Sequence, residues 1–457
     1  MVPVYPPLPQ KRSGISVKKP VEVIEYQKIF CKEDPSEVGE GDVALDKASF
    51  DQLNDFIASR NQELEEKKGE ETREIMKFTS TKRGKKALQA INYVGVISLK
   101  SGCQIEILPK ISESDTKEAR PKTRKVFMRM LQATTEIPRA KAARSSLDTE
   151  KMPMLEIFFR VFIDELLLLI KRGLKSDYLL HRDNERIFKG KLIFPEHIKR
   201  NAVHKERFFV EYDEFSINRP ENRLIKSTVM LLLRLSHNSA NLKDLNIIRA
   251  MLADIEESAN YDSDLAKVSC QRTAVEYKNV MDWCRLFLKK LTYTTFSGKN
   301  INFAFLFPME RVFESYVAKK VRTLLPSEYT VSVQDKSRWL FDYPRRMFQL
   351  RPDIVIKKNG KPKLILDTKW KLLSDPPSPD QADMYQMYAY LNRFKVDQVH
   401  LLYPKTRNTE GGTKIDYSWS DGPDKGKKIG FRFFDLENIE NNKTMLNELL
   451  GFQAGDS

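Results

Sequence analysis

The sequence has few cysteines, and they form no pattern that would build a disulfide framework or a zinc site. The four are Cys31, Cys103, Cys270 and Cys284. None lies in a Cys-x-x-Cys pair or at zinc-ligand spacing from a histidine. Free thiols in a chain of 457 residues fit a reducing compartment, so we expect a cytoplasmic protein.

Long hydrophobic runs are also missing. The opening stretch MVPVYPPLPQKRSG lacks the apolar segment that a signal peptide requires. The most apolar run, residues 158–170, is interrupted by Arg160, Asp164 and Glu165, which favours a buried amphipathic helix over a membrane span. We therefore expect no signal peptide and no membrane-spanning segment.

The chain does contain much charge, with an excess of basic residues. Hydrophobic residues make up 41% and charged residues 31%, which predicts a folded protein of two or three domains. The 78 Lys and Arg residues outnumber the 63 Asp and Glu residues, and the formal net charge is +15. This balance favours a polyanionic partner, either nucleic acid or a membrane surface.

The pattern of predicted helices and strands changes twice along the sequence, which predicts three domains. Residues 1–150 form an α+β region, in which residues 87–111 read as a β-hairpin around Gly102, followed by a charged, loop-like segment. Residues 151–300 are mostly helical. Residues 301–457 alternate helices and strands, which is typical of an α/β domain with one central mixed sheet flanked by helices.

The residues with candidate chemistry lie in RPDIVIKKNGKPKLILDTKWK (351–371). Two apolar strands flank Asn359-Gly360, a strong hairpin signal. If the strands pair about Gly360, positions that sum to 720 face each other, so Asp353 and Asp367 lie opposite each other, with Cβ atoms roughly 5 Å apart. Lys369 is two residues beyond Asp367, so it points to the same face.

Two adjacent carboxylates repel each other unless a cation lies between them. Mg²⁺ is the expected ion, with Mn²⁺ as the alternative, because both accept hard oxygen ligands. A bound metal polarises a phosphoryl oxygen and lowers the pKa of a coordinated water. Lys369 could position or deprotonate that water, or offset the charge on the pentavalent phosphate. The alternative interpretation is that these Asp and Lys residues lie on an ordinary, solvent-exposed hairpin and have no catalytic role. The buried character of the runs IVI and LIL favours a functional site.

The helices on either side of this hairpin add candidates. Glu310 and Glu314 are four residues apart on the preceding helix and share a face, so either could supply a further metal ligand. Gln386 and Tyr390 are four apart on the following helix and could contact a DNA phosphate or hold the lysine. Ordinary packing or solvation of these four side chains is the competing interpretation.

In this order, the motifs resemble those of PD-(D/E)xK nucleases that carry the added helix motif of RecB-like members. The wider chain resembles the McrC family, the nuclease subunits of McrBC modification-dependent restriction systems. The supporting stretches are IEILPKI (105–111), LLLLIKRGLKSDY (166–178), FKGKL (188–192), YDEFSINRPENRLIK (212–226), MERVFESYV (309–317) and DMYQMYAY (383–390).

The resemblance implies a role for each candidate. Asp353, Asp367 and Glu314 would be the metal ligands, Lys369 the catalytic lysine, and Gln386 and Tyr390 the accessory pair. It also implies a partner, a hexameric AAA+ GTPase of the McrB type that recognises modified cytosine in double-stranded DNA and whose GTP hydrolysis this chain stimulates. The chain itself has no GxxxxGK[ST] motif, which agrees with a nucleotide site in the partner.

By this resemblance, residues 1–150 are expected to dock the partner, and no membrane partner is expected. Two other functions stay open. One is a stand-alone PD-(D/E)xK repair nuclease, although no DNA-recognition motif is visible in the N-terminal half. The other is a non-catalytic assembly factor that stimulates a ring NTPase, although Asp353, Asp367 and Lys369 are intact.

Overall fold

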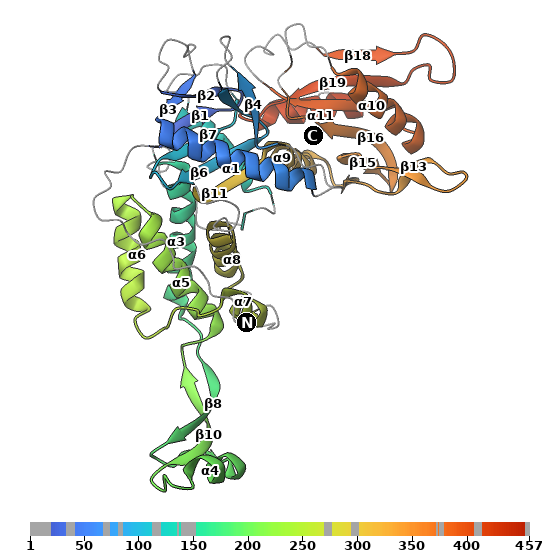
Figure 1. Ribbon diagram of the computed structural model, residues 1–457. Helices are drawn as coiled ribbons and strands as arrows, with labels where there is room; N and C mark the ends of the chain where they lie inside the picture. The colour runs from blue at the N-terminus through green and yellow to red at the C-terminus, as the bar shows by residue number, and fades with distance from the viewer. Residues whose placement is uncertain are drawn as a thin grey trace. The chain divides into compact units, whose positions relative to one another are not determined.

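The protein forms two compact units, each described by itself below. The computed structural model (Figure 1) describes residues 20–32, 42–66, 74–80, 86–111, 120–134, 137–138, 152–268, 277–293, 301–371, 373, 379–405 and 414–452. One unit is the helical region within Pro138–Thr294, and the other combines Lys18–Ile137 with Thr295–Ser457. The boundary near residue 300 within this second unit stays a prediction.

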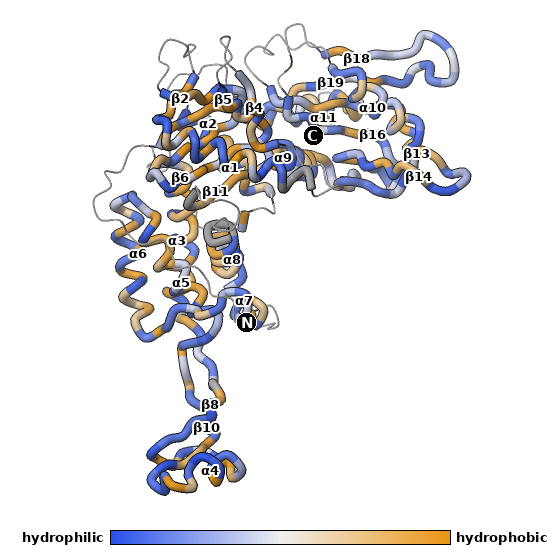
Figure 2. Tube along the Cα trace, viewed as in Figure 1, coloured by the Kyte–Doolittle hydropathy of each residue, from blue (hydrophilic) through white to orange (hydrophobic). Residues whose placement is uncertain are grey.

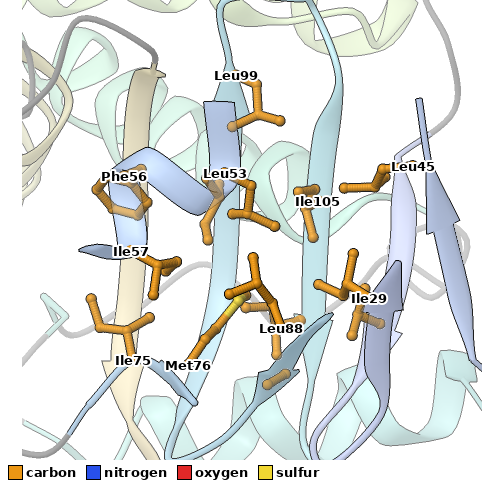
Figure 3. Close-up of a cluster of buried hydrophobic side chains, with 14 of the residues drawn as sticks. Ile29, Leu45, Leu53, Phe56, Ile57, Ile75, Met76, Leu88, Leu99 and Ile105 are labelled. Atoms are coloured by element: carbon orange, nitrogen blue, oxygen red, sulfur yellow. The ribbon is translucent and has the colours of Figure 1, made fainter. Parts of the chain in front are cut away.

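The described residues of the N-terminal part of the second unit contain two four-stranded sheets and two helices, α1 (Lys47–Glu66) and α2 (Arg120–Leu131). One sheet has the order β1-β7-β6-β11 and the other β3-β2-β5-β4. Helix α1 (Lys47–Glu66) contributes Leu53, Phe56 and Ile57 to the apolar core that these sheets share (Figure 3). The strands are β1 (Val21–Ile24), β2 (Lys28–Cys31), β3 (Val43–Leu45), β4 (Met76–Ser80), β5 (Lys86–Ala90), β6 (Tyr93–Leu99), β7 (Gln104–Leu108) and β11 (Ile301–Pro308).

The predicted hairpin is present as β6 and β7, which pair antiparallel. Gly102 makes the turn with a φ of 83°. Both strands lie inside the sheet, because β1 flanks β7 and β11 flanks β6, and nearly all their side chains are buried. A Cβ on Gly95 would lie 2.0 Å from the Phe305 carbonyl oxygen, so only glycine lets β11 pair here. The hairpin therefore offers few side chains to a partner. The prediction of a loop-like charged segment after it is wrong where the chain forms α2, whose buried Arg124 donates to Glu106 of β7 at 2.5 Å. The rest of that segment lies largely outside the described residues.

The helical unit is built around α3 (Met154–Arg172), whose apolar residues run along the helix (Figure 2). The helices α6 (Ser239–Met251) and α8 (Lys278–Tyr293) pack against both α3 and α5 (Pro220–Leu235), and α7 (Tyr261–Val268) packs against α5. The buried Glu156 of α3 accepts hydrogen bonds from Ser236 Oγ and from the backbone N–H groups of His237 and Asn238. This carboxylate therefore fixes the connection between α5 and α6, and the predicted mostly helical character is confirmed.

An arm extends from the helical unit (Figure 1). Strands β8 (Asp177–Glu185) and β10 (Phe208–Ser216) pair over their whole length, and β9 (Lys191–Leu192) and α4 (Phe194–Asn201) complete the arm. It exposes eight large apolar side chains, and Figure 2 shows hydrophobic residues around α4. They are Tyr178, Leu180, Ile187, Phe188, Phe194, Ile198, Val203 and Phe215. No helix in the described part of the chain is long and apolar enough to cross a membrane.

The C-terminal part of the second unit has one six-stranded mixed sheet, of order β12-β15-β16-β17-β19-β18. Strands β16, β17 and β19 are parallel to one another, and the other pairs are antiparallel. Side chains of α10 pack on one face with Val355, Ile365 and Leu401. The strands are β12 (Tyr329–Val333), β15 (Ile354–Lys358), β16 (Lys361–Thr368), β17 (Gln398–Pro404), β18 (Ile415–Ser418) and β19 (Lys428–Phe434).

Three helices accompany this sheet: α9 (Met309–Leu324), α10 (Gln381–Phe394) and α11 (Ile439–Leu450). Phe313 and Tyr316 of α9 contact Phe434 of β19 edge-to-face. A separate two-stranded ribbon consists of β13 (Arg338–Phe341) and β14 (Met347–Leu350). The prediction of a central mixed sheet flanked by helices is therefore confirmed.

Candidate active site

The hairpin of β15 and β16 brings the two candidate aspartates together. Asn359 and Gly360 both have positive φ, 52° and 77°, as a tight two-residue turn requires. The register shifts by one residue near the turn, after which Ile354 pairs with Leu366. One position further along, Asp353 and Asp367 lie opposite each other, as the sequence predicts.

The Asp353 carboxylate is held by Thr368, the residue that follows Asp367 on β16. The backbone N–H and the hydroxyl of Thr368 both donate to Asp353 Oδ2, at 2.8 and 2.7 Å. Hydrogen bonds to a carboxylate stabilise its charged form and fix its orientation. Asp353 is therefore positioned before any ligand arrives.

Asp367 is in a different environment, with only 2% of its surface exposed. Burial, and then the neighbouring Asp353, raise its pKa to about 7, although Lys369 opposes this shift. Its Oδ2 lies 2.9 Å from Lys369 Nζ, but in a geometry that is not that of a hydrogen bond. Near neutral pH the carboxyl is therefore divided between its protonated and ionised forms, and a cation would stabilise the ionised one.

Lys369 lies among three acceptors. Its Nζ is 2.9 Å from Asp367, 3.6 Å from an Asp383 oxygen, and donates to Gln386 Oε1 at 3.2 Å. Burial lowers the pKa of Lys369, but Asp367, Asp383 and Asp353 outweigh it and raise the pKa above its ordinary value. In this arrangement Lys369 is a protonated cation, suited to stabilising negative charge and not to removing a proton.

The predicted accessory pair holds this lysine. Gln386 accepts from Lys369 and donates through Nε2 to Tyr390 Oη at 2.7 Å. Tyr390 is almost fully buried, and this burial raises the pKa of its hydroxyl, so it stays neutral. One face of α10 therefore orients Gln386, which orients Lys369.

Glu314 reaches the site through another residue. Its Oε1 accepts from Gln334 Nε2 at 2.6 Å, and the backbone N–H of Gln334 donates to the Asp353 carbonyl oxygen at 2.8 Å. Within the described ranges, no three His, Cys, Asp or Glu side chains converge as a metal-binding group. The roles of Glu314 and of Glu310, one turn earlier on α9, as ligands stay predictions.

The paired aspartates fit a magnesium site. Mg²⁺ keeps several waters and is usually bound by one or two carboxylates together with substrate phosphates, so a third protein ligand is not required. The buried Asp367 Oδ2 accepts no hydrogen bond from any residue that the structure describes, and the raised pKa of Asp367 reflects a charge that is incompletely compensated. Both observations match an oxygen that would coordinate a hard cation.

Sequence reasoning missed three contributors. Asp383 is three residues before Gln386 and therefore on the same helical face, a spacing that could have revealed it. Thr368, next to Asp367 on β16, donates two hydrogen bonds to Asp353, and the hairpin register could have revealed this contact. Glu25 accepts from the Trp370 indole at 3.0 Å, and burial raises its pKa to about 7. Nothing local in the sequence links residue 25 to residue 370.

Comparison with known families identifies the chain's relatives. A family model described as McrBC 5-methylcytosine restriction system component matches residues 88–404, more than half of the chain. The chain belongs to the McrBC family. The part that matches the McrBC model contains all six predicted site residues: Glu314, Asp353, Asp367, Lys369, Gln386 and Tyr390.

Solved McrBC structures are similar to this McrBC-family chain. A chain of the refined half-complex from the tetradecameric assembly of Thermococcus gammatolerans McrB AAA+ hexamers with bound McrC matches with a TM-score of 0.68 and 17% identity, over 94% of this chain and 100% of that chain. The cryo-EM structure of the Thermococcus gammatolerans McrBC complex gives a TM-score of 0.47 and 19% identity, over 67% and 89%. The first likeness shows a shared fold. No curated protein sequence matches.

Proposed function

We propose that this chain is the metal-dependent endodeoxyribonuclease subunit of a McrBC-type restriction complex, with a PD-(D/E)xK arrangement in its C-terminal sheet. The observation that carries the proposal is the group of Asp353, Asp367 and Lys369 at the end of the β15–β16 hairpin. Buried charge of this kind costs stability unless it is compensated, so its presence at a sheet end points to function.

In the proposed reaction, Asp353 and Asp367 hold Mg²⁺ or Mn²⁺, with Glu314 as a candidate further ligand. The ion when bound supplies polarisation of a phosphoryl oxygen and a lowered pKa for a water. Lys369, protonated and fixed by Gln386, stabilises the negative charge that develops on the phosphate. Tyr390 keeps Gln386 in place. In this proposal the aspartates serve as ligands and the nucleophile is water, so the hydrolysis proceeds without a covalent intermediate.

We further propose a hexameric AAA+ GTPase of the McrB type as the partner, which selects double-stranded DNA with modified cytosine and whose GTP hydrolysis this chain stimulates. Support comes from the family and from the likeness to a chain of McrB AAA+ hexamers with bound McrC. For docking, the β8–β10 arm is a better candidate than the β6–β7 hairpin. Its exposed apolar side chains lie outside any core, whereas those of the hairpin are buried.

A paired assay tests this proposal. Cleavage of a methylated duplex and GTP turnover are measured with the partner present, for the wild type, for Asp367→Asn and for Asp254→Asn, an exposed aspartate in the helical unit. We expect Asp367→Asn alone to lose cleavage while both variants keep GTP stimulation. Cleavage by Asp367→Asn at the wild-type rate would leave the non-catalytic assembly factor as the better interpretation, and full activity without the partner would favour a stand-alone nuclease.

A further inference from the structure

The β13–β14 ribbon exposes an unusual set of side chains. It is a two-stranded antiparallel pair, joined at Arg338–Leu350, Trp339–Gln349 and Phe341–Met347, and it is not part of the six-stranded sheet. Three aromatic side chains on it are open to solvent: Phe341 at 53%, Tyr343 at 89% and Phe348 at 65%. A ribbon that exposes large rings in this way has surface suited to a ligand.

The ribbon is also strongly basic. Lys336, Arg338, Arg345 and Arg346 are exposed and form no ion pair with any described residue. The one acid on the ribbon, Asp342, pairs with Arg393 of α10 at 2.6 Å. The Arg346 guanidinium lies 4.9 Å from the Trp339 ring centre, which restricts its orientation. By contrast, basic side chains of the β8–β10 arm pair with its own acids, such as Arg182 with Glu211 and Lys189 with Glu185.

The ribbon leads directly into the candidate active site. β14 ends at Leu350, three residues before Asp353, a distance of about 10 Å at most along the chain. Between them, the Arg351 guanidinium donates to Gln334, the side chain that contacts Glu314. α10, which carries Gln386, packs against β13 and is held there by the Arg393–Asp342 pair (Figure 1). The basic ribbon is therefore fixed beside the proposed cleavage site.

We propose that the β13–β14 ribbon binds the phosphate backbone of duplex DNA next to the cleaved bond. The proposal rests on the nuclease function proposed above and names a substrate-binding surface for it. Unpaired arginines contact phosphates without reading sequence, and a two-stranded ribbon has the width that the major groove accepts. A surface of this kind suits a nuclease whose choice of DNA is made by a partner.

Fluorescence anisotropy with a labelled, unmodified duplex tests the proposal on the full chain without divalent ions. We expect Arg338→Ala/Arg345→Ala to weaken binding about 10-fold to 100-fold at 0.1 M salt and to reduce the slope of log K against log salt by about 2. The matched control is Lys361→Ala/Lys363→Ala, which removes two exposed lysines near the turn of the β15–β16 hairpin. This control variant should bind the duplex as the wild type does. Restoring charge with Arg338→Lys/Arg345→Lys should recover most of the affinity.

The outcomes separate this proposal from the proposed function. Unchanged affinity and salt slope in the arginine variant overturn the ribbon proposal, whether or not Asp367→Asn abolishes cleavage. If the arginine variant loses DNA affinity and the wild type shows no cleavage under any condition, the ribbon proposal is supported and the proposed nuclease function is overturned. An arginine variant that keeps its DNA affinity but no longer associates with the AAA+ partner identifies the ribbon as a protein-binding surface instead.

Discussion

The protein uses an antiparallel hairpin in two opposite ways. In the β15–β16 hairpin, the apolar residues Ile354, Ile365 and Leu366 are fully buried, and the charged residues gather at the strand ends. In the β8–β10 arm, large apolar side chains such as Ile187 and Val203 are 75% and 85% exposed. Both strand pairs are antiparallel. The two therefore differ in burial: the first hairpin carries the proposed catalytic residues on a buried core, and the arm keeps apolar side chains exposed for the proposed docking.

The largest effect is expected from the buried hairpin. Asp367→Asn removes a proposed metal ligand but keeps the shape of the side chain, so cleavage should fall by on the order of 1,000-fold or more. Association with the partner and GTP turnover should stay at the wild-type level. Cleavage and GTP turnover are measured on the same preparation. Parallel loss of both would mean that the two hairpins do not have separate functions.

The reverse result is expected from the arm. Ile187→Asp/Val203→Asp places charge on two highly exposed apolar positions, and should weaken association with the partner by about 10-fold to 100-fold without unfolding the protein. The control is Ile247→Asp/Met251→Asp, on the exposed face of α6 in the same unit. Size-exclusion chromatography and GTP turnover report association. Equal behaviour of the two double variants would contradict a docking role for the arm.

A more moderate effect tests how Lys369 is held. Gln386→Met removes the acceptor for Lys369, which should then move towards Asp383, and cleavage should fall by about 10-fold to 100-fold. Tyr390→Phe removes only the support of Gln386 and should cost less. Gln381→Met, at the exposed start of α10, is the control. Duplex affinity should be unchanged throughout, and a cleavage rate for Gln386→Met equal to that of the control would refute the positioning role.

Metal binding should depend on pH in a direction set by Asp367. Its pKa in the folded protein is raised from 3.8 to about 7, so its contribution to stability is present below pH 3.8 and is lost as pH rises through 7. A cation offsets this loss and competes with the proton. The rise in melting temperature on adding Mg²⁺ should therefore be larger at pH 8 than at pH 6, and absent in Asp367→Asn. A rise that does not change with pH would exclude Asp367 as a ligand.

The smallest effect is expected from Glu25, whose substitution should change stability and leave the functions of both hairpins intact. Burial raises the Glu25 pKa from 4.5 to about 7, so its contribution to stability is lost as pH rises between these values. Glu25→Gln keeps an acceptor for Trp370 and should remove a pH-dependent loss on the order of 1–3 kcal/mol. The free energy of unfolding is measured from pH 5 to pH 8. An identical pH profile in the variant and the wild type would show that Glu25 is not the titrating group.

Part of the site could be predicted because it depends on local rules. The Asn359-Gly360 turn predicts a hairpin that brings Asp353 close to Asp367, and the two-residue period of strands places Lys369 on the same face as Asp367. The turn alone pairs Lys358 with Lys361, a register that would place Asp353 opposite Leu366. The one-residue shift between Ile356 and Lys357 brings Asp353 opposite Asp367, and no local rule predicts that shift. The four-residue spacing on α10 likewise predicts that Gln386 and Tyr390 lie together, and they are hydrogen-bonded.

The amino-acid sequence by itself determined the features that neighbouring residues control: the turn, the strand faces and the helical spacings. Only the tertiary structure decided which distant segments meet. It placed β11 beside Gly95, Glu25 against Trp370, and Gln334 between Glu314 and Asp353. The physical reason is that a turn depends on a few backbone angles, whereas buried apolar strands can pair in several ways that look alike in sequence. The choice among those pairings depends on the whole core, which forms only when all the layers pack together.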